Sequence, residues 1–379
     1  MIGSVLVVGS GVDAWMTAAA LATATRGVTI AVAETAPPKP GRIAALPSLR
    51  GLHTRLGLSE EMVAKVCRAS PTLGSRYGEA VAPYGETGAM LEGVPFHHYW
   101  LRAAEGAPLG AWSLAAQAAA RGRFAPASRD PRSPLSTLDH GLTLDGAAYA
   151  ELLKATALRA GVALLEAQAR PEADLLVDAT GTEARLIGDE PWIDWSAWLP
   201  TGLTMSAEEN GLTPLFTPGA PLRAGRRERA MAGKVVAVGA AHGAIGAADG
   251  GELHLLHGAI SRLVALFPTG PAAVAEYNRL SEAALERARD MAILRWGALD
   301  APPEPLAWKI AQFESRGRVV MYDEEIWSES AWIHAFLARG VVPRRWDPLA
   351  ERMPLDRARA VLERMRAVIA QTAEAMPHV

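Results

Sequence analysis

Apolar runs and small residues alternate at the amino end of the chain in an order that predicts strand, turn, helix and strand. An apolar, β-rich run covers residues 4–8, and a glycine-rich segment follows at residues 9–14. Residues 15–25 are dominated by Ala, Met and Leu, which favour a helix. Residues 28–33 are again β-rich and end at Glu34. This order is typical of the first βαβ unit of a parallel sheet.

Two later apolar runs also predict strands that end in turns. Residues 175–181 contain Asp178 and end in Gly181, and residues 234–241 enter a turn at Gly239 and Ala240. In a doubly wound sheet the carboxyl ends of the strands converge on the ligand crevice. The pattern therefore predicts an α/β fold in which these two turns approach the first one.

The carboxyl third of the chain has a helical period instead. Residues 252–267, 271–296 and 354–375 read as amphipathic helices, with breaks at Pro302-Pro303 and around residues 340–343. We expect a largely α-helical carboxyl-terminal module.

The first turn carries candidate chemistry. Gly9 would turn tightly, Gly11 would let the backbone approach a pyrophosphate, and Ala14 would allow the helix to pack closely on the strand. Glu34, at the end of the second strand, suits a ribose hydroxyl, and the helix N-terminus would face the phosphates. The pattern favours a turn that binds an adenine dinucleotide rather than a turn that binds no ligand. By itself it does not separate FAD from NAD.

Either later turn alone could be an ordinary strand-to-helix connection, but the two together favour FAD. We predict the following cofactor-binding residues: Gly9, Gly11, Val12, Asp13, Ala14, Glu34, Asp178, Gly239, Ala240 and Leu253.

Composition narrows the class of protein. The chain has 379 residues, of which 50% are hydrophobic, and its net charge is -3. At ~100–200 residues per domain this length predicts two or three domains, or one large domain with insertions. No block of like charges indicates a nucleic-acid or lipid partner, and no apolar run reaches the ~18 residues that span a bilayer. The single cysteine, Cys67, and an amino end that already reads as a strand make the cytosol the expected compartment.

The histidines do not predict a metal site. His97 and His98 lie in an aromatic run without a Cys or carboxylate at ligand spacing. His254 and His257 could share a helical face, but a third ligand is not evident. We therefore expect no bound metal.

Three segments carry a resemblance to a known family. They are residues 9–16 (Gly-Ser-Gly-Val-Asp-Ala-Trp-Met), residues 93–100 (Gly-Val-Pro-Phe-His-His-Tyr-Trp) and residues 194–200 (Asp-Trp-Ser-Ala-Trp-Leu-Pro). Together they resemble the flavin-dependent tryptophan halogenases, and the similarity continues in order over nearly the whole chain. The resemblance implies a flavoprotein-hydroxylase-like FAD module at residues 1–260, with a substrate-side insertion at about 46–139, and a helical module at residues 261–379.

The resemblance also implies a chemistry and its partners. In this family a separate flavin reductase supplies reduced FAD, oxygen and halide give hypohalous acid, and this acid travels to a lysine beside an aromatic substrate. The segment that carries the lysine reads Ala-Ser-Pro-Thr-Leu-Gly here, which places Thr72 at the lysine position. Threonine cannot replace a cationic amine.

Other family positions also differ in this chain. The Trp-x-Trp-x-Ile-Pro signature should lie between residues 200 and 225, a stretch that contains no tryptophan. In the halide-binding loop Asp249 stands for the catalytic glutamate and Gly251 for the threonine whose backbone binds halide, and Glu252 follows. A carboxylate one residue from an anion site would repel chloride. Arg42 and Ile43 replace the Gly-Glu pair of the flavin loop.

Three interpretations follow from these residues. The chain is an FAD-binding protein of this family that has lost halogenation and acts as a flavin-binding or partner subunit, which is the interpretation we weight most. Alternatively, it is an active FAD-dependent halogenase or monooxygenase on an aromatic or indole-like substrate. The third alternative is a Rossmann NAD-dependent oxidoreductase.

Overall fold

The computed structural model describes residues 2–166, 172–206, 211–246, 250–267 and 270–379. Asp249, the residue predicted at the catalytic glutamate position, therefore lies outside the described residues. The chain forms two compact units. The first comprises Met1–Ser70, Leu142–Leu203 and Pro218–Arg289, and the second comprises Pro71–Gly141, Thr204–Thr217 and Asp290–Val379. The predicted domain division at residue 260 stays a prediction.

The first unit is built on a six-stranded sheet with the order β14-β15-β9-β1-β2-β8. Its strands are β1 (Ser4–Gly9), β2 (Thr29–Glu34), β8 (Ala163–Leu165), β9 (Leu175–Ala179), β14 (Met231–Ala232) and β15 (Val235–Ala237). Strand β1 runs parallel to both of its neighbours, so that Gly9 pairs with Glu34 on one side and with Ala179 on the other. The continuous apolar sequence of β1 fits a strand that is buried on both faces. The predicted α/β class and the parallel sheet are confirmed.

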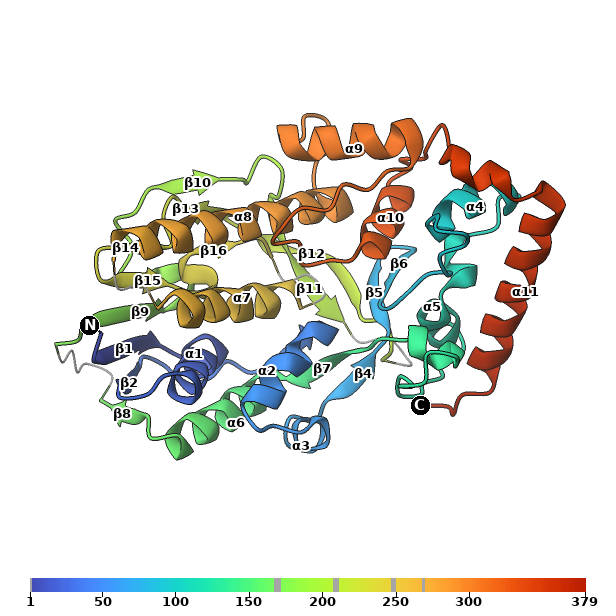
Figure 1. The fold of residues 1–379 in the computed structure, drawn as a ribbon. Coiled ribbons are helices and arrows are strands. Elements are labelled where there is room, and N and C mark those ends of the chain that lie inside the picture. Colours follow the sequence, from blue (N-terminus) through green and yellow to red (C-terminus); the bar gives the residue numbers. More distant parts are fainter. Residues whose placement is uncertain (1, 167–171, 207–210, 247–249, 268–269) are drawn as a thin grey trace. The chain divides into compact units, whose positions relative to one another are not determined.

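The helices of the first unit include the one predicted after the glycine-rich turn. They are α1 (Gly11–Ala24), α2 (Arg50–Arg55), α3 (Glu60–Val66), α6 (Gly146–Arg159), α7 (Gly251–Leu266) and most of α8 (Pro271–Trp296), with short 3-10 turns η1 (Pro47–Leu49), η4 (Gly181–Glu183) and η5 (Gly239–Ala241). Helix α1 packs against α6 and α7, as Figure 1 shows. Its Trp15 and Leu21 lie in one apolar core with Val177 of β9.

Short strands complete the first unit. Strands β10 (Trp192–Asp194), β13 (Gly225–Arg227) and β16 (Gly243–Ala244) form an antiparallel sheet. Strand β3 (Arg42–Ala45) pairs with β7 (Gly141–Asp145). The segment predicted to be the flavin loop, with Arg42 and Ile43, forms strand β3 and is therefore held in a sheet.

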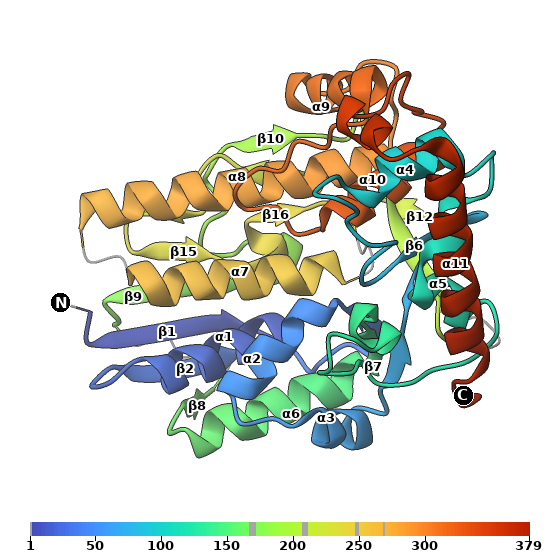
Figure 2. The same ribbon diagram turned by 45° about the vertical axis from the view of Figure 1, so that its right-hand side comes forward.

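The second unit is mainly helical. Of the helices predicted in the carboxyl third it contains the one at residues 354–375, whereas the helix at 252–267 and most of that at 271–296 belong to the first unit. The helices of the second unit are α4 (Phe96–Ala103), α5 (Leu114–Ala119), α9 (Glu304–Arg316), α10 (Glu329–Ala338) and α11 (Leu355–Glu374), with 3-10 turns η2 (Leu109–Trp112), η3 (Pro134–Thr137) and η6 (Pro348–Arg352). Helix α11 lies along α4 and α5, which come from the first third of the chain (Figure 2). The indole nitrogen of Trp112 donates a 2.8 Å hydrogen bond to the carbonyl of Leu362 and joins these segments.

A few strands accompany these helices. They are β4 (Ser70–Thr72), β5 (Gly74–Tyr77), β6 (Ala80–Pro83), β11 (Thr201–Ser206) and β12 (Leu215–Pro221), of which β4, β11 and β12 each begin or end in the first unit. Strands β5 and β6 are antiparallel, and Leu215 and Phe216 of β12 run parallel to β5.

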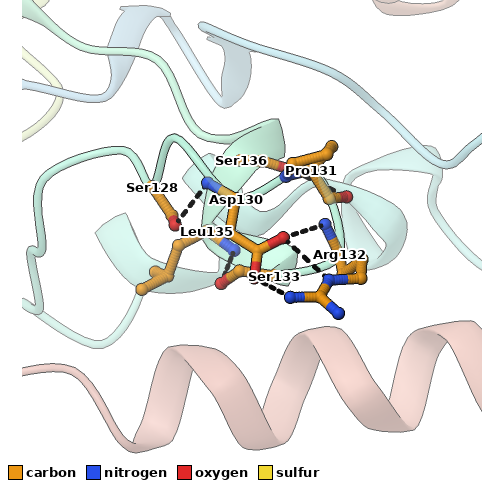
Figure 3. A network of polar contacts seen from close by, with 7 residues as sticks. All are labelled: Ser128, Asp130, Pro131, Arg132, Ser133, Leu135 and Ser136. Carbon is orange, nitrogen blue, oxygen red and sulfur yellow. Dashed lines mark hydrogen bonds and ion pairs between the residues drawn. The ribbon is translucent and has the colours of Figure 1, made fainter.

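One loop of the second unit is held by its own polar contacts, which Figure 3 shows. Asp130 accepts two 3.1 Å hydrogen bonds from the Arg132 guanidinium, and its backbone amide donates to the Ser128 hydroxyl. The Ser133 hydroxyl accepts from the amide of Leu135 at the start of η3. The bonds to Arg132 hold the pKa of Asp130 below its usual range.

No helix among the described residues is long and apolar enough to cross a membrane.

Candidate functional site

The predicted phosphate-binding turn has the geometry that an anion needs. A Cβ on Gly9 would lie 2.1 Å from the carbonyl oxygen of Ala179, so only glycine permits this approach of β1 to β9. Gly11 has a φ of +62°, and no described atom lies within 4 Å of the position that its Cβ would take. Ser10 caps α1 without a side-chain hydrogen bond. The first amides of α1 are therefore open to a negatively charged group.

Glu34, predicted to bind a ribose, lies beside Gly9 at the end of β2. Its Oε1 accepts a 2.8 Å hydrogen bond from the indole nitrogen of Trp15, and its Oε2 accepts one of 2.6 Å from Lys154 Nζ. The Lys154 ammonium also lies 5.2 Å from the centre of the Trp15 ring. Trp15 and Lys154 thus fix the carboxylate, while each of its oxygens keeps a second lone pair for a ligand hydroxyl.

Asp13 connects the first turn with the predicted turn at Gly239 and Ala240. Its carboxylate accepts a hydrogen bond from the Ala240 amide and lies directly against Gly239, whose φ is +58°. Burial raises the pKa of Asp13 to about 6, against the lowering effect of the Ala240 bond. The structure therefore brings together turns that are far apart in the sequence, as predicted.

Glu252 lies within electrostatic reach of Asp13, a pairing that the sequence did not predict. Desolvation of its carboxyl group and the charge of Asp13 raise the pKa of Glu252 to about 7. The residue as a whole is exposed, so solvent screens part of this effect. The site thus contains two acids with pKa values shifted toward neutrality.

Gly250 and Gly251, in the predicted halide loop, form the start of α7. Gly250 is in the left-handed conformation with a φ of +87°, and its Cβ would lie 2.7 Å from the amide nitrogen of Leu46. Gly250 therefore packs directly on the backbone at the end of β3 and on Leu46. Glu252 is the acid in the first turn of α7, which has no side-chain cap. Leu253 is 8% exposed and belongs to the core of the unit.

Asp178 is fully buried and satisfied within its own turn. Oδ1 accepts from the amide and the hydroxyl of Thr180, and Oδ2 accepts from the amides of Leu186 and Ile187. These bonds hold the chain that follows β9. Asp178 would therefore affect a bound cofactor indirectly, by positioning this turn. Arg42, in the changed flavin loop, donates to the carbonyl of Thr143 at 2.8 Å.

His254 and His257 interact with side chains of the segment at residues 48–55. Ser48 Oγ lies 2.6 Å from Nδ1 of His254, and Arg55 lies 2.5 Å from Nε2 of His257. Burial lowers the pKa of both imidazoles to about 4, so both are neutral near pH 7. The sequence did not predict either pair, because the partners are separated by about two hundred residues.

His97 and His98 in the second unit have structural partners as well. Nε2 of His97 donates a 2.7 Å hydrogen bond to the carbonyl of Gly317, since a carbonyl only accepts. Nδ1 of His98 accepts from the amide of Asp347. Within the described residues no group of three His, Cys, Asp or Glu side chains could hold a metal ion.

Thr72, at the predicted lysine position, is the last residue of β4 and is 1% exposed. The buried lysine of the second unit, Lys309, forms an ion pair with Glu325 and lies 3.7 Å from the centre of the Trp332 ring. Its side chain is fully buried. The Lys309 ammonium is thus held by an internal acid and two aromatic rings, of Trp332 and Tyr322.

The fold has close structural relatives. BrvH, a flavin-dependent halogenase from Brevundimonas sp. BAL3, is 28% identical, with a TM-score of 0.88 over 100% of this chain and 98% of that chain. Xcc4156, a flavin-dependent halogenase from Xanthomonas campestris, is 24% identical, with a TM-score of 0.87 over 100% and 97% of the two chains. Tar14, a tryptophan C-6 flavin-dependent halogenase from taromycin biosynthesis, is 19% identical, with a TM-score of 0.83 over 99% and 98%.

Two sequence comparisons were informative in different ways. A search of curated protein sequences finds no match to this chain. The sequence model of the tryptophan halogenase family, in contrast, matches residues 4–220 and 208–355. With a match of this extent, the chain belongs to the tryptophan halogenase family.

Proposed function

We propose that this protein binds FAD but does not carry out the lysine-dependent halogenation of its family. The observation that carries the proposal is the combination of an open phosphate-binding turn at Gly9 and Gly11 with a buried threonine at position 72. The first feature supports retention of the cofactor, and the second supports loss of the halogenating step.

The residues of the first unit fit the ADP part of FAD. Gly9, Gly11 and the free amides of α1 would hold the pyrophosphate, and Glu34 would accept from a ribose hydroxyl. When bound, FAD would supply the redox chemistry of the family. Asp13 and Glu252 add negative charge near this site, which would weaken the binding of an anionic cofactor without blocking it sterically.

In this interpretation the protein has no lysine ammonium at position 72, where the halogenating step of the family needs one. An ammonium can hold hypohalous acid by hydrogen bonding and charge, whereas a buried threonine hydroxyl offers one neutral donor. Glu252 places a carboxylate next to Gly251, where family members are expected to bind halide through the backbone. Lys309 does not substitute, because its ion pair with Glu325 is internal and its side chain is fully buried.

The partners follow from the same proposal. A separate flavin reductase would be needed if the flavin is reduced, and an aromatic substrate or a homologous partner subunit are the other expected partners. The cytosol stays the proposed compartment, with Cys67 as a free, buried thiol.

The first experiment is a titration with FAD, followed by the visible absorption of flavin and by the quenching of tryptophan fluorescence. Saturable binding supports a flavoprotein, and NADH in the same assay tests the NAD-dependent alternative. If NADH binds and FAD does not, the proposal is wrong.

The second experiment tests catalysis with a flavin reductase, halide and indole substrates. We expect no halogenated product from the natural protein. The variant Thr72→Lys tests whether the remaining machinery is intact, and Thr72→Ala is its matched control. Because Thr72 is buried, circular dichroism must show that Thr72→Lys is folded. Product from the natural protein would favour the alternative of an active halogenase, which the 28% identity to BrvH over the full chain supports.

A further inference from the structure

A small cavity of the second unit lies between β6 and α10, which pack side by side (Figure 1). Its volume is about 100 Å³, well below the ~300–1,000 Å³ of sites for drug-sized molecules. Two arginines, a histidine and a tyrosine line it, and the rest of the lining is Ala and Val. Among the described residues that line the cavity there is no aspartate or glutamate, so its lining is positively charged.

Arg295, the first of the two arginines, is 8% exposed and held between aromatic rings. Its guanidinium lies 5.3 Å from the centre of the Tyr77 ring and 5.2 Å from that of Trp327, and Nη1 donates to the Tyr77 hydroxyl at 3.3 Å. The Tyr77 ring is itself stacked between Phe216 and Trp296. Aromatic faces attract a cation and leave its net charge in place. The cation of Arg295 is therefore fixed before any ligand arrives.

Arg339, the second arginine, follows the last residue of α10. Its Nη2 donates to the carbonyl of Gly297 at 3.1 Å, which is the one hydrogen bond of this side chain within the described part of the chain. Burial lowers the pKa of the Arg339 guanidinium, whereas a nearby carboxylate would raise it. Because a guanidinium has five N–H donors, Arg339 keeps donors for a ligand.

His334 adds a neutral donor to the lining. Burial and the charge of Arg295 lower the pKa of His334 to about 4, so the imidazole is neutral near pH 7. The Thr87 hydroxyl accepts from Ser330 at 3.0 Å and lies 3.0 Å from Nε2 of His334. The proton of Thr87 is thus directed to Nε2, which assigns the ring proton of His334 to Nδ1.

The carboxyl end of α10 does not cancel the positive charge of the cavity. The last carbonyls of a helix carry partial negative charge when they have no partner. Here the amides of Gly340 and Val341 donate to the carbonyls of Leu337 and Phe336, both at 3.0 Å. The turn after α10 therefore satisfies these carbonyls, and an anion at the arginines does not face them as free acceptors.

The remaining walls of the cavity are apolar. Ala82 of β6 and Ala335 of α10 are 7% and 4% exposed, and Val81 lies beside them. Ala338 is exposed and marks the open side. An inorganic anion would leave these methyl groups without contacts, whereas a short alkyl chain would cover them.

We propose that this cavity binds a short aliphatic monocarboxylate, with the carboxylate at Arg295 and Arg339 and the alkyl chain against the alanine methyl groups of β6 and α10. The planar guanidinium suits a carboxylate because it can donate two parallel hydrogen bonds. The inference does not rest on FAD binding, because every residue that lines the cavity belongs to the second unit.

The test follows [1-¹³C]propanoate by the broadening of its NMR signal when the full chain is added. The neutral probe of the same shape is [1-¹³C]propanamide. We expect saturable binding of propanoate that is at least about tenfold tighter than that of propanamide, since a hydrogen bond between charged groups contributes that much. Hexanoate should bind no more tightly than propanoate, because the cavity has no room for the longer chain.

The variant Arg339→Gln removes the charge and keeps an amide that can donate to Gly297. It should weaken propanoate binding about tenfold or more. Arg345→Gln changes an exposed arginine that does not line the cavity and is the matched control, which should leave binding unchanged. Ala338→Leu keeps both guanidiniums but fills the open side, and it must also weaken binding; circular dichroism checks that each variant is folded.

Four results would overturn the inference. The first is equal binding of propanoate and propanamide, and the second is binding that is unchanged in folded Arg339→Gln or Ala338→Leu. The third is tighter binding of hexanoate, which would indicate an open apolar surface. The fourth is displacement of propanoate by phosphate or chloride at a lower concentration than propanoate itself needs, which would assign the cavity to an inorganic anion.

Discussion

Asp13 and Gly239 are in direct contact: a Cβ on Gly239 would lie 2.2 Å from Oδ2 of Asp13. The Asp13 carboxylate therefore lies at the place where the first turn of α1 meets the turn after β15. This acid is next to the free amides that would hold a pyrophosphate, and it interacts with Glu252.

FAD binding should depend on pH because of these acids. The pKa values are about 6 for Asp13 and about 7 for Glu252, so both become ionised as the pH rises through this range. The dinucleotide is anionic throughout, and we expect its affinity to fall between about pH 5.5 and about pH 8. Fluorescence titrations across this range measure the effect. Asp13→Asn/Glu252→Gln should give a flat profile and about tenfold tighter binding at the upper end.

Asp13 should also affect stability with a defined sign. Its folded pKa, about 6, is above the ordinary aspartate value of 3.8, so folding favours the protonated form. The stability that this preference contributes is present below the lower value and is lost as the pH rises through the higher one. Asp13→Asn should therefore raise Tm more at about pH 8 than at about pH 5. An equal gain at both values would contradict the shifted pKa.

Glu252 should prevent halide binding at the start of α7. Glu252→Gly removes the carboxylate and leaves the uncapped amides of the helix for an anion. We expect ³⁵Cl NMR to show line broadening by this variant at slightly alkaline pH and little by the natural protein, in which Glu252 is then ionised. Glu252→Asp keeps the charge and serves as the control. Equal broadening by Glu252→Gly and Glu252→Asp would show that charge is not the cause.

Lys154 should stabilise the first unit through Glu34. The two side chains are 20% and 18% exposed, and their atoms are 2.6 Å apart. Lys154→Met leaves the Glu34 carboxylate with Trp15 as its partner, and we expect a loss of about 1–2 kcal/mol in the free energy of unfolding by urea. Lys65→Met, on the exposed side of α3, is the matched control and should change it by less than about 0.5 kcal/mol.

Lys309 and Glu325 should behave as a coupled buried pair. Lys309→Met alone leaves a buried carboxylate without its cation and should cost about 3–5 kcal/mol of unfolding free energy. The double variant Lys309→Met/Glu325→Gln should cost less than the sum of the two single variants. Additive losses in a urea-based double-mutant cycle would show that the two groups do not interact.

The features predicted from sequence are local ones. The turn at Gly9 and Gly11, its helix and Glu34 lie within one βαβ unit, where glycine position and apolar pattern determine the geometry. The partners of Glu34 are different: Trp15 is within the motif, but Lys154 comes from a helix 120 residues later and no pattern connects it. The same holds for Ser48 and His254.

The sequence also did not predict which charged side chains would lie near one another. Asp13 and Glu252 were each named from sequence, one as a cofactor residue and one as a disturbance of the halide site. Their mutual effect depends on how α1 and α7 pack, which a sequence pattern does not determine.

The contact between Gly250 and the backbone of Ala44 to Leu46 has a consequence for protein engineering. A transplanted loop that carries any residue other than glycine at position 250 would put a side chain where that backbone already lies, unless the segment at residues 42–47 is exchanged too. Loop exchanges that place a larger residue at position 250 should therefore replace both segments together, and single-loop chimeras of this kind should be the ones that misfold.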